Sequence, residues 1–252
     1  MIIRKSPEEL ELMRRAGRIT AMARDAVVDA VRPGVTTSAL DAVAEEVIRG
    51  EGATPSFKGY RGFPGSICAS LNEQVVHGIP GDRVLKAGDL FKADVGAVWE
   101  GFHGDSAVTV FVGHPPSDVA EKLVRVTRDS LEAGIGFLRP GNRISDVGSA
   151  IQQMVEGAGF NVVREYVGHG IGRSLHEDPH IPNYGPPGRG PEIKPGLVVA
   201  VEPMVNVGDW QTRVLGDDWT VVTADGSLSA HFEHTIAVTE DGPEVLTASP
   251  GA

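Results

Sequence analysis

The chain has 252 residues, enough for one large domain or two small ones. Its formal net charge of −11 argues against a general nucleic-acid binder, because such a protein depends on a basic surface, although local basic patches remain compatible with it. The single cysteine, Cys68, excludes a disulfide framework and a cysteine-rich zinc site, and it favours a reducing compartment.

The beginning of the chain, MIIRKSPEELELMRRAG, lacks the apolar core of a signal peptide. No stretch of the sequence approaches the roughly 20 apolar residues that a membrane-spanning helix requires. We therefore expect a cytoplasmic protein that makes no contact with a membrane.

Two helices are predicted in the first fifty residues. Ser6-Pro7-Glu8-Glu9 is a capping box with proline at the first helical position, and apolar residues at helical spacing follow it. Arg32-Pro33-Gly34 ends this helix. A second helix, capped by Thr37 or Ser38, is expected to end at Gly50.

The same order of elements recurs later in the chain. A helix is predicted from Ser117 to Leu138, followed by a stop at Arg139-Pro140-Gly141 and a further helix over residues 145–156. A shift of 107 residues superposes the first stop, residues 32–34, on the second. This match indicates an internal repeat, although two unrelated helix pairs that end in the same common helix-stop residues would also produce it.

Between the helix pairs, short strands are expected over residues 67–77, and the stretch from Leu90 to Val112 predicts a hairpin. Both of its runs alternate and are rich in β-branched residues, and the turn falls at Glu100-Gly101. Each run carries one carboxylate, Asp94 or Asp105, at nearly equal distances from the turn. We expect these two to be close to cross-strand neighbours, with Cβ atoms roughly 5 Å apart if they are directly opposite.

The surroundings of this pair are apolar, so both carboxylates are predicted to be buried. Burying an unpaired charge is costly, and two adjacent carboxylates cannot both stay ionised without help. This stretch alone leaves three explanations open: metal ions hold the pair, an arginine from elsewhere pairs with it, or the two groups share a proton.

Two more carboxylates occur in apolar runs of the second half. Leu197 to Met204 is predicted to be a strand that carries Glu202, and Ala230 to Val238 is predicted to be a strand that carries Glu233. Two divalent cations would neutralise four carboxylates. An oxygen-rich site with one imidazole suits manganese, iron, cobalt or magnesium better than a structural zinc ion.

Histidines complete the set of candidate residues. His169 is flanked by glycines in Gly168-His169-Gly170, where the backbone can approach closely, so it is the strongest candidate ligand. His77 and His176 are weaker candidates on position alone. The remaining histidines are expected to have structural or solvated roles; they are His103, His114, His180, His231 and His234.

Taken together, five stretches resemble type I methionine aminopeptidases. They are VVHGIP (75–80), ADVG with GFHGDSAV (93–96 and 101–108), YVGHGIGRSLHEDP (166–179), VEPMVN (201–206) and WTVVTADGSLSAHFEHT (219–235). The resemblance implies an α+β pita-bread fold, in which two pseudo-symmetric halves surround a curved antiparallel sheet. It also implies a single catalytic domain over residues 1–252, with halves at about 6–112 and 117–247.

The resemblance further implies a function and a ligand set. The function is removal of the initiator methionine from nascent chains whose second residue is small. Two divalent ions, of cobalt, manganese, iron, zinc or nickel, would be held by five residues: Asp94, Asp105, His169, Glu202 and Glu233. Asp105 and Glu233 would bridge both ions, and a bridging water would attack the peptide carbonyl.

Roles for other residues follow from the same resemblance. His77, His176 and Glu202 would be catalytic, with both histidines also contacting the substrate and Glu202 moving the proton of the water. The pocket for the methionine side chain would be formed by Tyr60, Phe63, Cys68 and Trp219, with Phe57 and Leu175 at its edge. Leu175 replaces a phenylalanine common in bacterial members, and His231 replaces an uncharged amide.

The expected partners are the N-termini of nascent polypeptides, with the ribosome as a candidate contact and neither nucleic acid nor membrane among them. A monomer is expected. One alternative keeps the fold and the metals but directs the enzyme to proline-containing substrates, as in a proline-directed aminopeptidase or dipeptidase. Another is a catalytically silent relative that binds peptides or the ribosome, although such relatives typically lose metal ligands.

Overall fold

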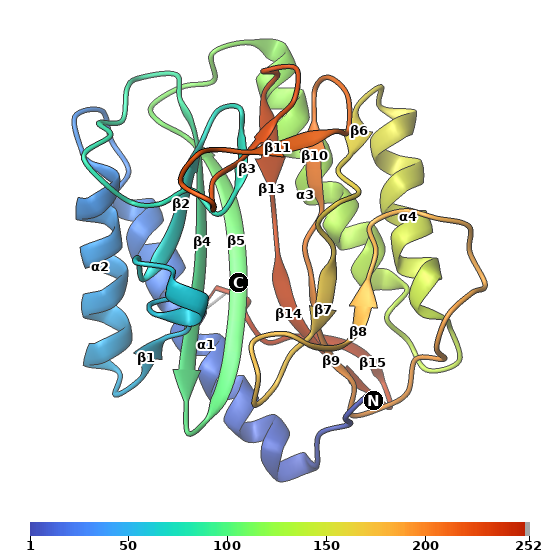
Figure 1. Cartoon of the computed structure of the whole chain (residues 1–252). Coiled ribbons are helices and arrows are strands. Elements are labelled where there is room, and N and C mark those ends of the chain that lie inside the picture. The colour runs from blue at the N-terminus through green and yellow to red at the C-terminus, as the bar shows by residue number, and fades with distance from the viewer. Residues whose placement is uncertain (250–252) are drawn as a thin grey trace.

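The computed structural model describes residues 1–249. Within these residues, four α-helices and fifteen strands follow one another (Figure 1). The helices are α1 (Pro7–Ala30), α2 (Thr37–Gly50), α3 (Asp118–Gly136) and α4 (Ile144–Gly157), with a short 3-10 helix, η1, at Tyr60–Gly62. The strands are β1 (Thr54–Pro55), β2 (Ile67–Leu71), β3 (Gln74–Val76), β4 (Leu90–Trp99), β5 (Phe102–Phe111), β6 (Asn161–Val162), β7 (Gly168–Gly170), β8 (Glu177–Ile181), β9 (Val198–Val201), β10 (Met204–Asn206), β11 (Thr212–Val214), β12 (Val221–Thr223), β13 (Ser229–His231), β14 (His234–Thr239) and β15 (Gly242–Val245).

The predicted helix starts are confirmed with one exception. Ser6 caps α1, and its hydroxyl accepts from the backbone N–H of Glu9 while the Glu9 carboxylate accepts from the N–H of Ser6. The cap of α2 is Thr36, not Thr37 or Ser38 as predicted. The reason is that the Thr37 hydroxyl is already used: it donates to the carbonyl of Gly81 at 3.0 Å.

The predicted hairpin is confirmed, but its register differs from the expected one. Both turn residues have positive φ angles, 50° at Glu100 and 78° at Gly101, as a two-residue hairpin loop requires. Asp105 therefore faces Gly96, while Asp94 faces Ala107 on one side and Cys68 of β2 on the other. The two aspartates lie on one face as diagonal neighbours and not directly opposite each other.

Each strand predicted to carry a glutamate is broken at that glutamate. Glu202 lies between β9 and β10, and Glu233 lies between β13 and β14. β9 and β14 pair in a five-stranded sheet, whereas β10 and β13 pair in a separate three-stranded sheet. Both carboxylates thus sit where the chain passes from one sheet to another, and Pro203, which has no N–H, follows the first of them.

The helices form two pairs on opposite sides of the molecule (Figure 1). α1 packs against α2 and against the hairpin strands β4 and β5, while α3 packs against α4 and against β13. Each pair covers its own apolar core. The helices therefore leave one surface of the strands free to form the site.

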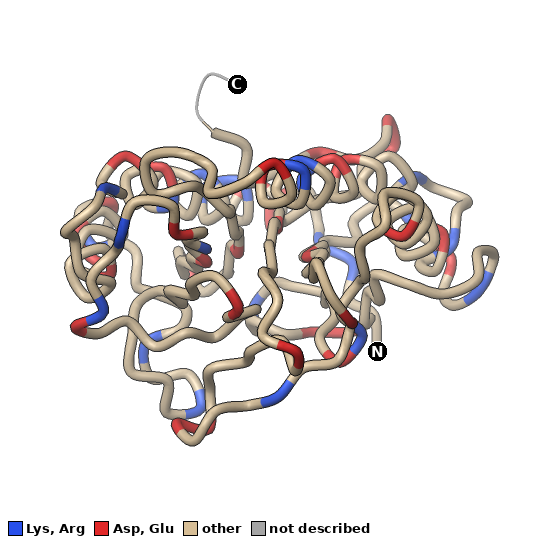
Figure 2. The backbone as a smooth tube through the Cα atoms, turned by 90° about the horizontal axis from the view of Figure 1, so that it is seen from above, with Lys and Arg blue, Asp and Glu red and all other residues tan. Residues whose placement is uncertain are grey.

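Charged residues are spread over the whole molecule. Figure 2 shows lysine and arginine segments interspersed with aspartate and glutamate segments along the outer helices. No single element therefore gathers the positive charge among the described residues. None of the helices within residues 1–249 combines the length and the apolar character that a membrane span needs.

The contact between α1 and β5 depends on Gly104. A Cβ atom at this position would lie 2.8 Å from the Thr20 hydroxyl and 2.9 Å from the Gly17 backbone. We expect Gly104→Ala to lower the free energy of unfolding by about 1–3 kcal/mol, because the helix must shift to admit the methyl group. Thermal denaturation measures this effect.

Gly136 provides the matched control. It is the last residue of α3, and a Cβ atom there would meet nothing within 4 Å. Gly136→Ala should leave the melting temperature unchanged or raise it slightly, since alanine restricts the unfolded chain. Equal destabilisation by the two substitutions would contradict the packing explanation.

Candidate metal centre and active site

The two halves of the chain meet where β5 lies beside the end of β13 and the start of β14. The Asp105 N–H donates to the Thr235 hydroxyl at 2.9 Å, and that hydroxyl donates to the Asp105 carbonyl at 2.8 Å. Farther along, the Glu233 N–H donates to the Ala107 carbonyl at 2.9 Å, and the Ser106 hydroxyl donates to the Glu233 carbonyl at 2.8 Å. These bonds place the Asp105 and Glu233 side chains next to each other.

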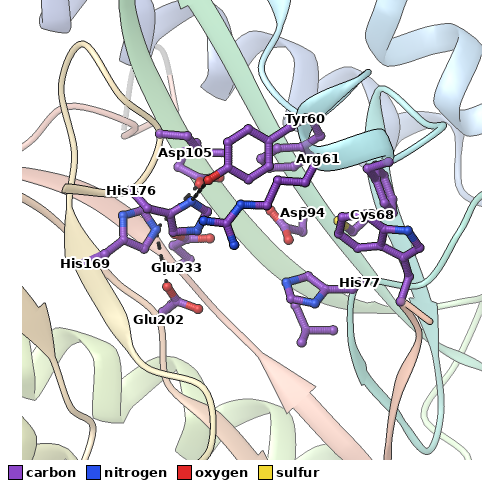
Figure 3. A pocket seen from close by; sticks show the side chains of 15 residues that line it. Tyr60, Arg61, Cys68, His77, Asp94, Asp105, His169, His176, Glu202 and Glu233 are labelled. Atoms are coloured by element: carbon purple, nitrogen blue, oxygen red, sulfur yellow. Dashed lines mark hydrogen bonds and ion pairs between the residues drawn. The ribbon is translucent and has the colours of Figure 1, made fainter. Parts of the chain in front are cut away.

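His169 joins this pair from β7. One ligand atom from each of Asp105, His169 and Glu233 lies within 4.8 Å of the others. The Nε2 atom of His169 is also 3.5 Å from a Glu202 oxygen (Figure 3). Its Nδ1 atom lies 2.9 Å from the Gly170 carbonyl, which can only accept, so Nδ1 carries the proton. Nε2 is therefore left with a free lone pair that faces the carboxylates, as a metal ligand requires.

The carboxylates of this cluster are buried. Asp94, Asp105 and Glu233 are 7%, 4% and 3% exposed. Burial raises the pKa of Asp94 to about 7. Burial, followed by the charge of neighbouring carboxylates, raises the pKa of Asp105, Glu202 and Glu233 well above the usual range. Because these groups are removed from water, their ionised forms have a high free energy in the protein without bound metal.

No arginine or lysine within residues 1–249 neutralises the cluster. The basic groups nearest to its carboxylates are the imidazoles of His169 and His231, at 3.5 to 4.0 Å, and burial lowers both of their pKa values to about 3, so that neither carries charge at neutral pH. Among the described residues, one oxygen of Asp94 and one of Asp105 have no hydrogen-bond partner. The explanation by an unseen arginine is therefore wrong, and shared protons or metal ions remain.

The donor set fits a divalent metal. Four carboxylates and one neutral imidazole line one cavity and supply hard oxygen ligands and a free nitrogen, and three of these groups lie within 4.8 Å of one another. The two unpartnered aspartate oxygens point to ligands that the polypeptide does not provide. Bound cations would favour the ionised carboxylates and so remove the cost of burying them.

His77 stands at the other side of the cavity, opposite Glu202 (Figure 3). Its backbone is left-handed, with a φ angle of 59°, and its ring meets the edges of Tyr166 and Trp219 at centroid distances of 5.7 and 6.3 Å. Burial lowers the pKa of His77 to about 4, so the ring is neutral at pH 7. It can therefore accept or donate a proton at a substrate without carrying charge in the resting protein.

His176 is oriented by Tyr60. The Tyr60 hydroxyl lies 2.9 Å from His176 Nδ1, and the rings of His176 and His169 are 4.2 Å apart between centroids (Figure 3). Burial, with a smaller contribution from the positive charge of Arg61, lowers the pKa of His176. The hydrogen bond to Nδ1 leaves Nε2 available for a substrate.

A cavity of about 180 Å³ connects the carboxylate cluster with an apolar wall. All the residues predicted to form the methionine pocket line it: Phe57, Tyr60, Phe63, Cys68, Leu175 and Trp219. Phe63 and Trp219 meet edge to face at 5.1 Å between centroids. The five predicted metal ligands, His77 and His176 line the same cavity, so the structure brings all the predicted site residues together.

Two lining residues were not predicted from the sequence. Val76 is the last residue of β3 and directly precedes His77, so its position in the cavity could have been predicted from that neighbour. Arg61 lies in a turn where its φ angle of 49° directs an exposed side chain to the cavity, and its guanidinium lies 5.4 Å from the Tyr60 ring centre. No sequence pattern predicts this conformation, because arginine rarely adopts a positive φ angle.

His231, which stands where the resemblance predicts an uncharged amide side chain, lies beside the carboxylate cluster. His231 is buried, and its Nε2 atom lies 4.0 Å from a Glu233 oxygen. Burial lowers its pKa to about 3, so the ring adds no charge beside Glu233 at neutral pH. His231 therefore lies next to the cluster but is not one of the predicted metal ligands.

The sequence model of metallopeptidase family M24 matches residues 11–240. The chain belongs to this family. Methionine aminopeptidase 1 of Bacillus subtilis (strain 168) is 56% identical over 247 residues, which cover 98% of this chain and 99% of that protein. The crystal structure of methionine aminopeptidase from Thermotoga maritima is 49% identical, with a TM-score of 0.96 over 98% of this chain and 99% of the other.

More distant members share the fold alone. Prolidase from Pyrococcus furiosus is 22% identical, with a TM-score of 0.80, and the match covers 98% of this chain but 66% of the prolidase. The pita-bread fold expected from the sequence is thus confirmed, and so is the resemblance to methionine aminopeptidases. Membership of a metallopeptidase family also supports the use of divalent metal by the cluster.

Removal of metal should destabilise the protein. A ligand present at 100 times its dissociation constant stabilises the native state by about 2.7 kcal/mol, and chelation removes this contribution. At about 2–4 °C per kcal/mol, we expect the melting temperature to fall by about 5–10 °C. In Glu233→Gln, which loses one predicted ligand, the chelator should cause a much smaller shift; an equal shift would argue against this site.

The effect of chelation should be larger at pH 8 than at pH 5. Burial raises the pKa of Asp94 from its ordinary value of 3.8 to about 7 in the metal-free fold, so the native state retains a proton that the unfolded chain has lost. This contribution to stability is complete below about pH 4 and is lost as the pH rises through 7. Melting curves of metal-loaded and chelated protein across this range measure it; a constant difference between them would contradict the explanation.

Proposed function

We infer that the protein removes the N-terminal methionine from nascent proteins and peptides whose second residue is small. One observation carries this conclusion: a buried cluster of carboxylates and an imidazole adjoins an apolar wall within the same cavity. Relatives that are 49% to 56% identical over nearly the whole chain are methionine aminopeptidases. The protein is therefore a hydrolase with aminopeptidase activity.

The cavity suggests how a substrate is placed. The methionine side chain lies against the aromatic wall, where Phe63, Cys68 and Trp219 enclose an apolar thioether. Its carbonyl group then lies between His77 and His176, beside the cluster. The remaining peptide leaves the cavity on the side of His77, Tyr166 and Glu202, where a second, more open depression begins.

Asp94, Asp105, His169, Glu202 and Glu233 would hold two divalent ions of cobalt, manganese, iron, zinc or nickel. Such ions supply a water of lowered pKa and polarise a carbonyl oxygen. Glu202, at the edge of the cluster with its side chain 13% exposed, accepts the proton of the attacking water and passes it to the leaving amine.

The histidines act on the substrate itself. With Nδ1 of His176 accepting from Tyr60, Nε2 carries the proton and donates to the carbonyl oxygen as negative charge develops there. His77, neutral and packed against two aromatic edges, holds the leaving amine by a hydrogen bond while Glu202 delivers the proton. These two residues position the scissile bond between the apolar wall and the cluster.

The wider setting follows from this function. The chain would act as a single catalytic domain over residues 1–252, as a monomer in the cytoplasm, on N-termini that emerge from the ribosome. A proline-directed specificity is not favoured, because the prolidase shares only the fold at 22% identity. A silent binding protein is not favoured either, since all five predicted ligands line the cavity.

Release of free methionine from Met-Ala-Ser tests the proposal. Metal-free protein is titrated with Mn²⁺, Co²⁺ and Fe²⁺, beside an Asp105→Asn variant. We expect metal-dependent release that is absent in the variant. Cleavage of Xaa-Pro peptides without cleavage of Met-Ala-Ser would favour the proline-directed alternative, and metal binding without any release would favour the silent one.

The role of His77 gives a separate prediction. His77→Ala should lower turnover about 10²-fold or more, because it removes the hydrogen bond that positions the leaving amine. Its metal content should stay near that of the unchanged protein, since His77 is not part of the carboxylate cluster. Loss of metal in this variant would mean that His77 is a ligand and not a substrate contact.

A further inference from the structure

The loop between β7 and β8 carries two residues of the active site. Leu175 belongs to the apolar wall, and His176 faces the carbonyl position. The loop contains Gly172 and no regular structure, so its position must be fixed by specific contacts. One of these reaches the first half of the chain: the His103 N–H donates to the Gly172 carbonyl at 2.8 Å.

A buried ion pair fixes the other end of the loop. Lys5 Nζ lies 2.6 Å from a Glu177 oxygen, and the two side chains are 3% and 9% exposed. The second oxygen of Glu177 accepts from the Ser174 N–H at 3.1 Å. Glu177 directly follows His176 in the chain, so this carboxylate holds the loop on both sides of Leu175 and His176.

Lys5 is itself held in place. Its N–H donates to the Gly196 carbonyl at 2.7 Å, beside the five-stranded sheet. A Cβ atom at Gly172 would lie 2.5 Å from Lys5 Cε and 2.7 Å from a Glu177 oxygen, so the lysine stem fills the space that this glycine leaves. The segment before α1 therefore forms part of the support of the loop.

We propose that Lys5 is a positioning residue which, through Glu177, fixes the loop that places Leu175 and His176 at the substrate. The proposal rests on the proposed function. A buried carboxylate without its partner must turn towards water, and its bond to Ser174 would then be lost. The metal cluster should keep its ligands without this link, because β7, which carries His169, is held by β9 as well as by β8, the strand that begins at Glu177.

Lys5→Met tests the proposal, because it keeps the length of the stem and removes the charge. We expect kcat/KM for Met-Ala-Ser to fall about tenfold to a hundredfold, as small misplacements of catalytic groups do. The number of metal ions bound should not change. In zinc-loaded protein labelled with ¹⁵N-histidine, the ring resonances of His176 should shift while those of His114 stay in place.

Arg14→Met is the matched control. Arg14 also forms an ion pair near the N-terminus, with both oxygens of Glu244 at 2.7 Å, but it does not touch the loop. The Arg14→Met substitution should lower the melting temperature without changing kcat/KM or the His176 resonances. Equal changes in the two variants would overturn the proposal, as would an unchanged Lys5→Met protein.

A second variant keeps the test decisive if Lys5→Met does not fold. Lys5→Met combined with Glu177→Gln removes both charges, so no unpaired charge is buried. This protein should fold and still show a reduced kcat/KM; full activity would overturn the proposal. If the unchanged protein releases no methionine, the proposed function fails, whereas the His176 resonances still decide whether Lys5 positions the loop.

Discussion

Four carboxylates lie together where the two halves of the chain meet, three of them buried and Glu202 at the edge, and their mutual repulsion is the constraint that the rest of the structure satisfies. The ionised form of each carboxylate would have a lower free energy in water. Asp105 and Glu233 are held next to each other, where β5 meets the end of β13 and the start of β14, by a backbone bond from Glu233 to Ala107 and by the hydroxyls of Ser106 and Thr235. Such an arrangement is stable only if protons or cations compensate the charge.

The seam also explains the architecture around it. The two strands that carry Glu202 and Glu233 break at these residues and continue in another sheet. The breaks release the two carboxylates from the alternation of a regular strand and direct both towards Asp105 and His169. The helix pairs on either side bury the apolar surfaces that keep the sheets in place.

Much of this could be predicted from the sequence because the relevant interactions are local. The Ser6 cap and the Glu100-Gly101 turn depend on residues close in the chain, and the structure contains both. The breaks at Glu202 and Glu233 could not be predicted, since an apolar run looks the same whether it stays in one sheet or changes sheets. The buried pair of Lys5 and Glu177 joins residues far apart in sequence, so no local pattern indicates it.

The central claim is that metal ions, and not shared protons, compensate the buried carboxylates. Isothermal titration of metal-free protein with Mn²⁺ tests it most directly, with Asp105→Asn and the surface variant Glu244→Gln measured beside it. We predict two ions per chain in the unchanged protein and in Glu244→Gln, and weaker or incomplete binding in Asp105→Asn. Absence of binding in the unchanged protein, or equal binding in all three, would contradict the account.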